Sequence, residues 1–175
     1  MAIYQFEDRI PKIAESAGVH ETAQVIGDVT IGEDCYVGPG AIIRGDYSRT
    51  VIGRGTSIQE GVIIHARPGE ECIIGNEVTV GHAAIIHGAR IKDYAVIGMG
   101  AIVSDWAVVG EWAVVGEGAV VKSRMEIPPE TIAVGVPAKV IDKKVDADFK
   151  EFWTKSKKDY QELGKKIKTA MKRIG

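Results

Sequence analysis

The sequence predicts a mainly β chain that winds into a parallel β-helix and ends in one α-helix. An aliphatic residue recurs at every sixth position through most of the 175 residues, which is typical of a solenoid. The apolar residues are mostly Val, Ile and Ala, because aromatics make up only 6% of the chain, and this bias favours strands. Apolar residues at three-and-four spacing near the C-terminus predict the helix.

The six-residue period defines the expected core. An amphipathic helix cannot follow this period, and an antiparallel meander would alternate with period two. We therefore expect short strands joined by tight corners, three to a triangular coil, with coils stacked roughly 4.8 Å apart. About five coils are predicted. The repeated aliphatics, which should point inward, are Val25, Ile31, Val37, Ile43, Ile52, Ile58, Ile64, Ile74, Val80, Ile86, Ile91, Ile97, Val103, Val109, Val115 and Val121.

The period is interrupted three times. Three extra residues lie between Ile43 and Ile52, four lie between Ile64 and Ile74, and one residue is missing between Ile86 and Ile91. Insertions in a solenoid usually emerge as loops on one edge, so we expect loops at the two insertions.

Residues 1–141 are expected to form the β-helix, and residues 142–175 to pack along it within the same domain, with a helix over 145–174. The C-terminal segment carries 11 Lys or Arg against 6 Asp or Glu, and the rest carries 11 against 18. A basic helix lying on an acidic body explains this asymmetry better than a nucleic-acid-binding helix. No nucleic-acid partner is therefore expected.

Several features argue for an intracellular chain. Cys35 and Cys72 form no disulfide or zinc pattern and are expected as small buried residues. No stretch approaches the roughly 20 apolar residues of a membrane span, and Asp8 and Arg9 interrupt any signal sequence. We expect a cytoplasmic protein without a membrane partner.

Two of the four histidines fall on one predicted edge. His65 and His87 follow the turns at Ile64 and Ile86, which lie three turns apart and therefore stack, and Arg44 occupies the same place one coil earlier. Two imidazoles one coil apart can share a metal ion at Zn–N distances of about 2.0 Å. His20 precedes the repeat and is expected at the surface.

A third histidine falls on a different edge. The turns at Ile58 and Val80 stack, which brings Gln59 and Glu60 beneath His82. His82 can join the other two histidines only if the edges of two neighbouring copies meet. The pattern thus predicts a homotrimer with a three-histidine metal site at each interface. The alternative is that all three are polar corner residues that contact solvent or a neighbour.

Three motifs resemble those of the γ-class carbonic anhydrases, which are hexapeptide-repeat proteins. They are Ile43-Arg44-Gly45-Asp46, Ser57-Ile58-Gln59-Glu60-Gly61, and the run from Gly81 to Gly88 that contains His82 and His87. The Arg44–Arg49 run and Tyr160-Gln161-Glu162-Leu163 resemble most the branch named after carnitine-operon and phenylacetate-degradation proteins. The resemblance implies a left-handed winding and a site in which His65, His82 and His87 bind Zn²⁺, with Fe²⁺ or Co²⁺ as substitutes.

The resemblance also implies roles for neighbouring residues. The position of Gln59 orients metal-bound water in that family, and Asp46 matches the acid beside the arginine. Glu60 stands where Asp is usual, and that acid pairs across the interface with the arginine matched by Arg44. The archetypal enzymes carry a long acidic loop with a shuttle glutamate, whereas the loop here is short; Glu70, Glu71 and Tyr160 are candidate substitutes.

The leading hypothesis is therefore a zinc-dependent lyase that hydrates CO₂ reversibly to bicarbonate through metal-bound hydroxide. An acyl-CoA thioesterase could use the same metal site. A CoA-dependent hexapeptide acyltransferase would need one histidine base and no metal, and a metal-binding scaffold would need no catalysis. No HExxH, CxxC, P-loop or nucleophile-elbow motif offers a different chemistry.

Overall fold

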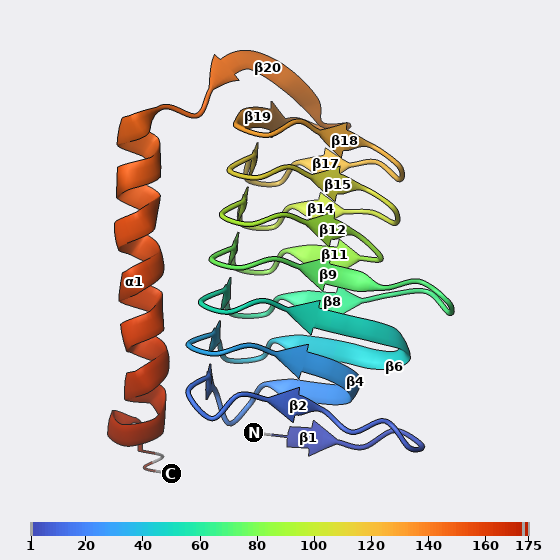
Figure 1. Ribbon diagram of the computed structural model, residues 1–175, viewed down its shortest axis with the longest axis vertical. Coiled ribbons are helices and arrows are strands. Elements are labelled where there is room, and N and C mark those ends of the chain that lie inside the picture. The colour runs from blue at the N-terminus through green and yellow to red at the C-terminus, as the bar shows by residue number, and fades with distance from the viewer. Residues whose placement is uncertain (1, 173, 175) are drawn as a thin grey trace.

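The computed structural model describes residues 2–172 and 174 as a stack of coils with one long helix along its side (Figure 1). One sheet joins the strands of two faces of the stack: β1 (Ala2–Tyr4), β2 (Lys12–Ile13), β4 (Gln24–Ile31), β6 (Ile42–Ile52), β8 (Ile63–His65), β9 (Cys72–Ile74), β11 (Ile85–His87), β12 (Arg90–Ile91), β14 (Ile102–Val103), β15 (Val108–Val109), β17 (Val120–Val121) and β18 (Glu126–Ile127). The third face is a second sheet: β3 (Gly18–Val19), β5 (Tyr36–Val37), β7 (Ser57–Ile58), β10 (Thr79–Val80), β13 (Val96–Ile97), β16 (Val114–Val115), β19 (Thr131–Val134) and β20 (Lys139–Lys144).

The mainly β solenoid is confirmed, but the predicted number of coils is wrong. The second sheet contributes one strand to each of about seven coils, from β3 to β19, rather than five. The six-residue spacing in fact continues into the outer coils, because Ile13 and Val19 lie twelve and six residues before Val25 and Ile127 lies six residues after Val121. All strand pairs are parallel within the stack, and only β20 pairs with β19 in the antiparallel sense. The left-handed winding stays a prediction from the resemblance.

The core lies where the period places it. All sixteen repeated aliphatics are at most 1% exposed. Fully burying a Val or Ile side chain contributes roughly 1.5–3 kcal/mol, so this column of side chains is the main source of stability. Cys35 and Cys72 are both free and buried, as expected, and burial raises the pKa of the Cys72 thiol to about 11.

Only one of the two insertions forms a loop. Residues 66–71 form a loop between β8 and β9, as expected. The insertion between Ile43 and Ile52 instead continues as strand β6 around a corner, so the loop predicted there is wrong. Strand β4 of the preceding coil pairs with β6 on both sides of a register shift, from Gly27 opposite Gly45 to Val29 opposite Thr50, so residues 46–49 bulge out between two paired stretches.

The C-terminal helix α1 (Ala147–Ala170) is shorter than the predicted range 145–174, of which Arg173 lies outside the described residues. It begins where the Asp146 carboxylate accepts a hydrogen bond from the Phe149 backbone N–H at 2.8 Å. The helix runs beside the stack from the last coil back toward the first (Figure 1). No helix among the described residues is long and apolar enough to span a membrane.

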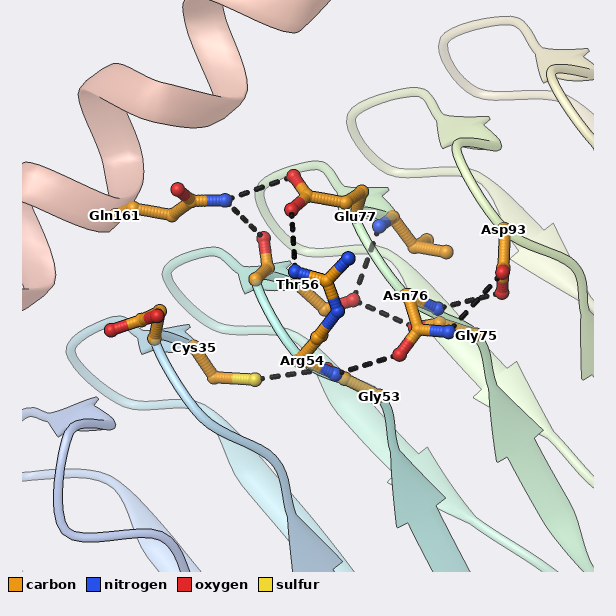
Figure 2. A network of polar contacts seen from close by, with 12 residues as sticks. Cys35, Gly53, Arg54, Thr56, Gly75, Asn76, Glu77, Asp93 and Gln161 are labelled. Atoms are coloured by element: carbon orange, nitrogen blue, oxygen red, sulfur yellow. Dashed lines mark hydrogen bonds and ion pairs between the residues drawn. The ribbon is translucent and has the colours of Figure 1, made fainter.

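Contacts at the C-terminal half of α1 hold it against the second sheet. Gly164 lies directly over Gly18, where a Cβ on Gly18 would meet the Gly164 carbonyl oxygen at 2.0 Å. Figure 2 shows the next contact, in which the Gln161 side-chain amide donates to the Glu77 carboxylate at 2.9 Å and to the Gly55 carbonyl. This half of the helix is therefore fixed by close backbone approach and by polar bonds to several coils.

Candidate functional site

His65 and His87 lie one above the other on one edge of the stack. They end strands β8 and β11, whose register pairs them directly, and their ring centroids are 5.3 Å apart. Ile43, in the coil that precedes β8, pairs with Ile64, and this register places Arg44 in the same column as His65 and His87. The predicted ladder of Arg44, His65 and His87 is therefore present.

Asp46 connects the lower part of this ladder. One carboxylate oxygen accepts a hydrogen bond from Arg44 Nε at 3.0 Å, and the other lies 3.0 Å from His65 Nε2. Burial by itself would raise the pKa of Asp46, but the hydrogen bonds and charges of Arg44 and His65 outweigh it and lower that pKa. Burial, followed by the Arg44 charge, lowers the pKa of His65, which favours the neutral imidazole.

His87 has a carboxylate partner that the sequence analysis missed. Asp105, from the corner after β14 one coil above, lies 2.6 Å from His87 Nδ1 and also accepts a hydrogen bond from Arg67 Nε at 2.8 Å. Burial opposes ionisation of Asp105, but its contacts with Arg67 and His87 lower its pKa. Extending the histidine column by one coil to Ser104-Asp105 is the signal that would have found it.

His82 lies on a second edge, as predicted, together with Gln59 and Glu60. Its Nδ1 forms an ion-pair contact with the Glu60 carboxylate, whose other oxygen accepts a hydrogen bond from the Tyr36 hydroxyl at 2.5 Å. Burial opposes ionisation of Glu60, but the Tyr36 and His82 contacts lower its pKa. The Gln59 side chain is almost buried, with 5% of the residue exposed. Tyr36 was not predicted, because its side chain reaches across a corner from β5.

Tyr160 lies near the second edge and not near the His65–His87 pair. Its ring packs against Tyr36 with centroids 5.2 Å apart, and it lines a cavity together with Gln59 and His82. Burial, and then the charge of Glu60, raises the pKa of its hydroxyl. Glu70 and Glu71 belong to the loop of residues 66–71, where Glu71 forms an ion pair with Arg90 at 3.6 Å.

The two edges flank a single face of the stack. In one coil His82 precedes strand β11 and His87 ends it, so their side chains lie on opposite sides of that face. Accordingly, the described residues of one chain contain no group of three or more His, Cys, Asp or Glu placed to hold a metal ion. His20, expected at the surface, is only 9% exposed and bonds Thr22 Oγ1 through Nδ1 at 2.8 Å.

The face between the two edges is an apolar stripe. Alternate residues of its strands point outward, and each lies in register with the next along the stack. Four of them are partly exposed, and Ile63 is 39% exposed. The stripe consists of Ile42, Ile63, Ile85, Ile102 and Val120.

The chain is similar to solved hexapeptide-repeat structures over nearly its whole length. A Bacillus cereus protein provisionally named an acetyltransferase is 38% identical, with a TM-score of 0.94 over 97% of this chain and 98% of that one. A hexapeptide transferase family protein from Anaplasma phagocytophilum is 28% identical, with a TM-score of 0.89 over 93% and 96% of the two chains.

Comparisons of sequence agree with the structural ones. The family model described as "Bacterial transferase hexapeptide (six repeats)" matches residues 11–45 and 88–123. The carnitine operon protein CaiE of Escherichia coli O157:H7 is 43% identical over 75 residues, which span 43% of this chain and 38% of CaiE. These names support the acyltransferase alternative more than CO₂ hydration, and they give no support to a lyase or to zinc. The chain belongs to the hexapeptide-repeat family of bacterial transferases.

Proposed function

We propose that three copies of the chain assemble through the apolar stripe, so that His82 of one copy meets His65 and His87 of the next. The stripe lies between the two histidine edges, and a partly exposed row of aliphatic side chains favours burial against a like surface. Cyclic assembly of such chains brings the two kinds of edge together at every interface. Glu60 then approaches the Arg44 side of the neighbouring copy.

The three histidines fit a divalent metal ion such as Zn²⁺, with Fe²⁺ or Co²⁺ as alternatives. Each imidazole contacts a carboxylate through one ring nitrogen, with Asp46, Glu60 and Asp105 as the partners, and its second nitrogen is the one that would bind a metal. Carboxylates that hold the far nitrogen of a ligating histidine fix its tautomer and its orientation. The low pKa of His65 favours the neutral form that binds metal.

The reaction we propose for this site is the reversible hydration of CO₂ to bicarbonate. A divalent ion held by three imidazoles makes water a nucleophile near neutral pH. Gln59, which is buried and lines the same cavity as His82, would orient that water through its amide, and the carboxylates would keep the imidazoles in place. The carboxylate-supported pair of His65 and His87 is the observation that carries this proposal.

Acyl transfer from CoA is the second candidate, and the family comparisons favour it. His87 and Asp105 form a histidine–carboxylate pair that could remove a proton from an acceptor without any metal. The hydrolysis of an acyl-CoA thioester at the metal site is a related possibility. A site that binds metal without catalysis would show neither activity.

Parallel assays of purified trimer separate these candidates. CO₂ hydration is followed by stopped-flow pH change, and release of CoA from acetyl-CoA is followed with a thiol reagent, with and without an acceptor and before and after chelation. Under the first proposal, hydration falls at least 100-fold on chelation and in each of His65→Ala, His82→Ala and His87→Ala. His20 is the fourth histidine and lies outside the proposed site, so His20→Ala is the control variant and is expected to keep full activity.

Opposite results would point to acyl transfer. Acceptor-dependent CoA release that survives chelation but is lost in His87→Ala and Asp105→Asn would replace the hydratase proposal. Metal content near one ion per chain with neither activity would leave only the scaffold.

A further inference from the structure

A cavity of about 390 Å³ lies between the N-terminal half of α1 and the second sheet. Its floor consists of the outward-facing side chains of Val96, Val114 and Ile132, and its outer wall includes Phe149 and Trp153. Small-molecule sites in proteins are typically mostly apolar and about 300–1,000 Å³ in volume. The cavity therefore has the size and lining of a ligand site.

Polar groups gather where the cavity reaches the second histidine edge. Gln59, His82 and Tyr160 all line it there. The Gln59 amide and the Tyr160 hydroxyl can each donate a hydrogen bond, and burial keeps the pKa of Tyr160 above its usual value so that the hydroxyl retains its proton. Two donors at one end of an apolar chamber suit a carbonyl or carboxyl oxygen.

The cavity is local and does not reflect a loosely placed helix. At the other end of α1 the backbone of Gly164 touches Gly18, and Lys157, 2% exposed, is enclosed between Trp112 and Trp153. The Lys157 ammonium also donates to Thr79, which itself lines the cavity, at 3.3 Å. The helix is thus fixed, and Phe149 and Trp153 pack in one hydrophobic cluster with Val96, Val114 and Ile132, so these side chains form the buried base of the cavity.

We propose that this cavity binds the apolar acyl or aryl part of a carboxylic-acid derivative, with its carbonyl end at Gln59 and His82. The inference rests on the second candidate function, acyl transfer or thioester hydrolysis, in which His82 borders the reacting site, and it names the substrate class of that reaction. A CO₂ molecule would occupy only a small part of the cavity. The substrate that fills it is an acyl compound whose length the Phe149 and Trp153 wall limits.

Calorimetric titration of the full-length, as-purified protein with acetate, butyrate, hexanoate and octanoate tests the proposal. Affinity is expected to rise about fourfold per added CH₂ until the cavity is full, and then to fall. Val114→Phe fills the cavity and should weaken hexanoate binding at least tenfold while sparing acetate. Val51→Phe, on an outward position of β6 far from the helix, is the matched control.

A second measurement does not depend on Val114→Phe folding. 6-Bromohexanoate should quench the fluorescence of the native protein, and Trp153→Phe should remove that quenching, because Trp153 lines the cavity and the other two tryptophans do not. Affinity that does not change with chain length, or quenching that persists in Trp153→Phe, would overturn the proposal.

The histidine site and the cavity can fail separately. His87→Ala lies outside the cavity lining, so hexanoate binding should persist in it while the proposed catalysis is lost. Length-dependent binding without any hydratase or transferase activity in the native protein would overturn the proposed function and keep the acyl site. Full activity together with an affinity that does not change with the chain length of the carboxylate would overturn the acyl site and keep the proposed function.

Discussion

Gly18 and Gly164 lie so close that a Cβ atom on Gly18 would be 2.0 Å from the Gly164 carbonyl oxygen. Gly18→Ala must push the helix off the sheet, and overpacking of this kind costs about 1–3 kcal/mol. A Cβ on Gly164 would meet the Cys35 carbonyl oxygen at 3.2 Å and the Gly18 backbone at 3.7 Å, and alanine favours a helix by about 1 kcal/mol. Urea unfolding should show a marked loss of stability for Gly18→Ala and little change for Gly164→Ala. Equal losses would contradict this account of the helix contact.

Lys157 should make stability depend on pH in the alkaline range. Burial lowers its pKa from 10.5 to about 8. Between those values the unfolded chain binds more protons than the folded one, so this residue makes stability rise with pH from about 8 to 10.5. Lys157→Met should abolish that rise and match or exceed native stability at pH 7, by up to about 3 kcal/mol. Thermal unfolding from pH 7 to 10.5 measures both effects, and Lys158→Met, on the exposed side, should leave the rise intact.

Asp105 should matter to metal affinity because it holds His87. Loss of a carboxylate that orients a ligating histidine typically weakens metal binding 10–100-fold. Asp105→Asn should therefore lower Zn²⁺ affinity by that factor in competition with a chromophoric chelator. Asp93→Asn is the control, since Asp93 bonds Asn76 on a different edge. Unchanged affinity in Asp105→Asn would remove His87 from the ligand set.

Ile63 tests the proposed assembly. Its side chain lies in the middle of the apolar stripe and is 39% exposed in the single chain. Ile63→Glu should convert the trimer to a folded monomer in light scattering after size exclusion, with an unchanged far-ultraviolet dichroism spectrum. Val51→Glu, on the next face, should remain trimeric. A native protein that is monomeric at all concentrations would refute the assembly and, with it, the shared site.

The sequence was sufficient for the core and for the columns of side chains. A six-residue period determines which residues point inward, and counting turns gives the register, so Arg44, His65 and His87 could be aligned before the structure was known. It was not sufficient at the first insertion. Strand β6 has 11 residues against eight in β4, and its two ends pair with β4 on either side of the inserted residues, so the strand continues where a loop was expected.

The partners of the site histidines were harder to predict. Asp105 and Tyr36 reach their partners from a neighbouring coil or across a corner, and the six-residue period carries no information on the direction of corner side chains. Two outer coils were missed although Ile13, Val19 and Ile127 continue the six-residue spacing at the two ends of the stack. The contact between His82 and the other histidines depends on a second copy, which no pattern within one chain determines.

Helix α1 also constrains how the chain can change in length. Each added coil would lengthen the stack by roughly 4.8 Å, whereas each helical residue advances about 1.5 Å. Because the helix spans the stack and is anchored to the first coils at Gly18, gaining or losing one coil requires about three helical residues to be gained or lost with it. The length of the helix therefore limits the number of coils. We expect duplication of a whole coil to be tolerated only together with a matching lengthening of α1.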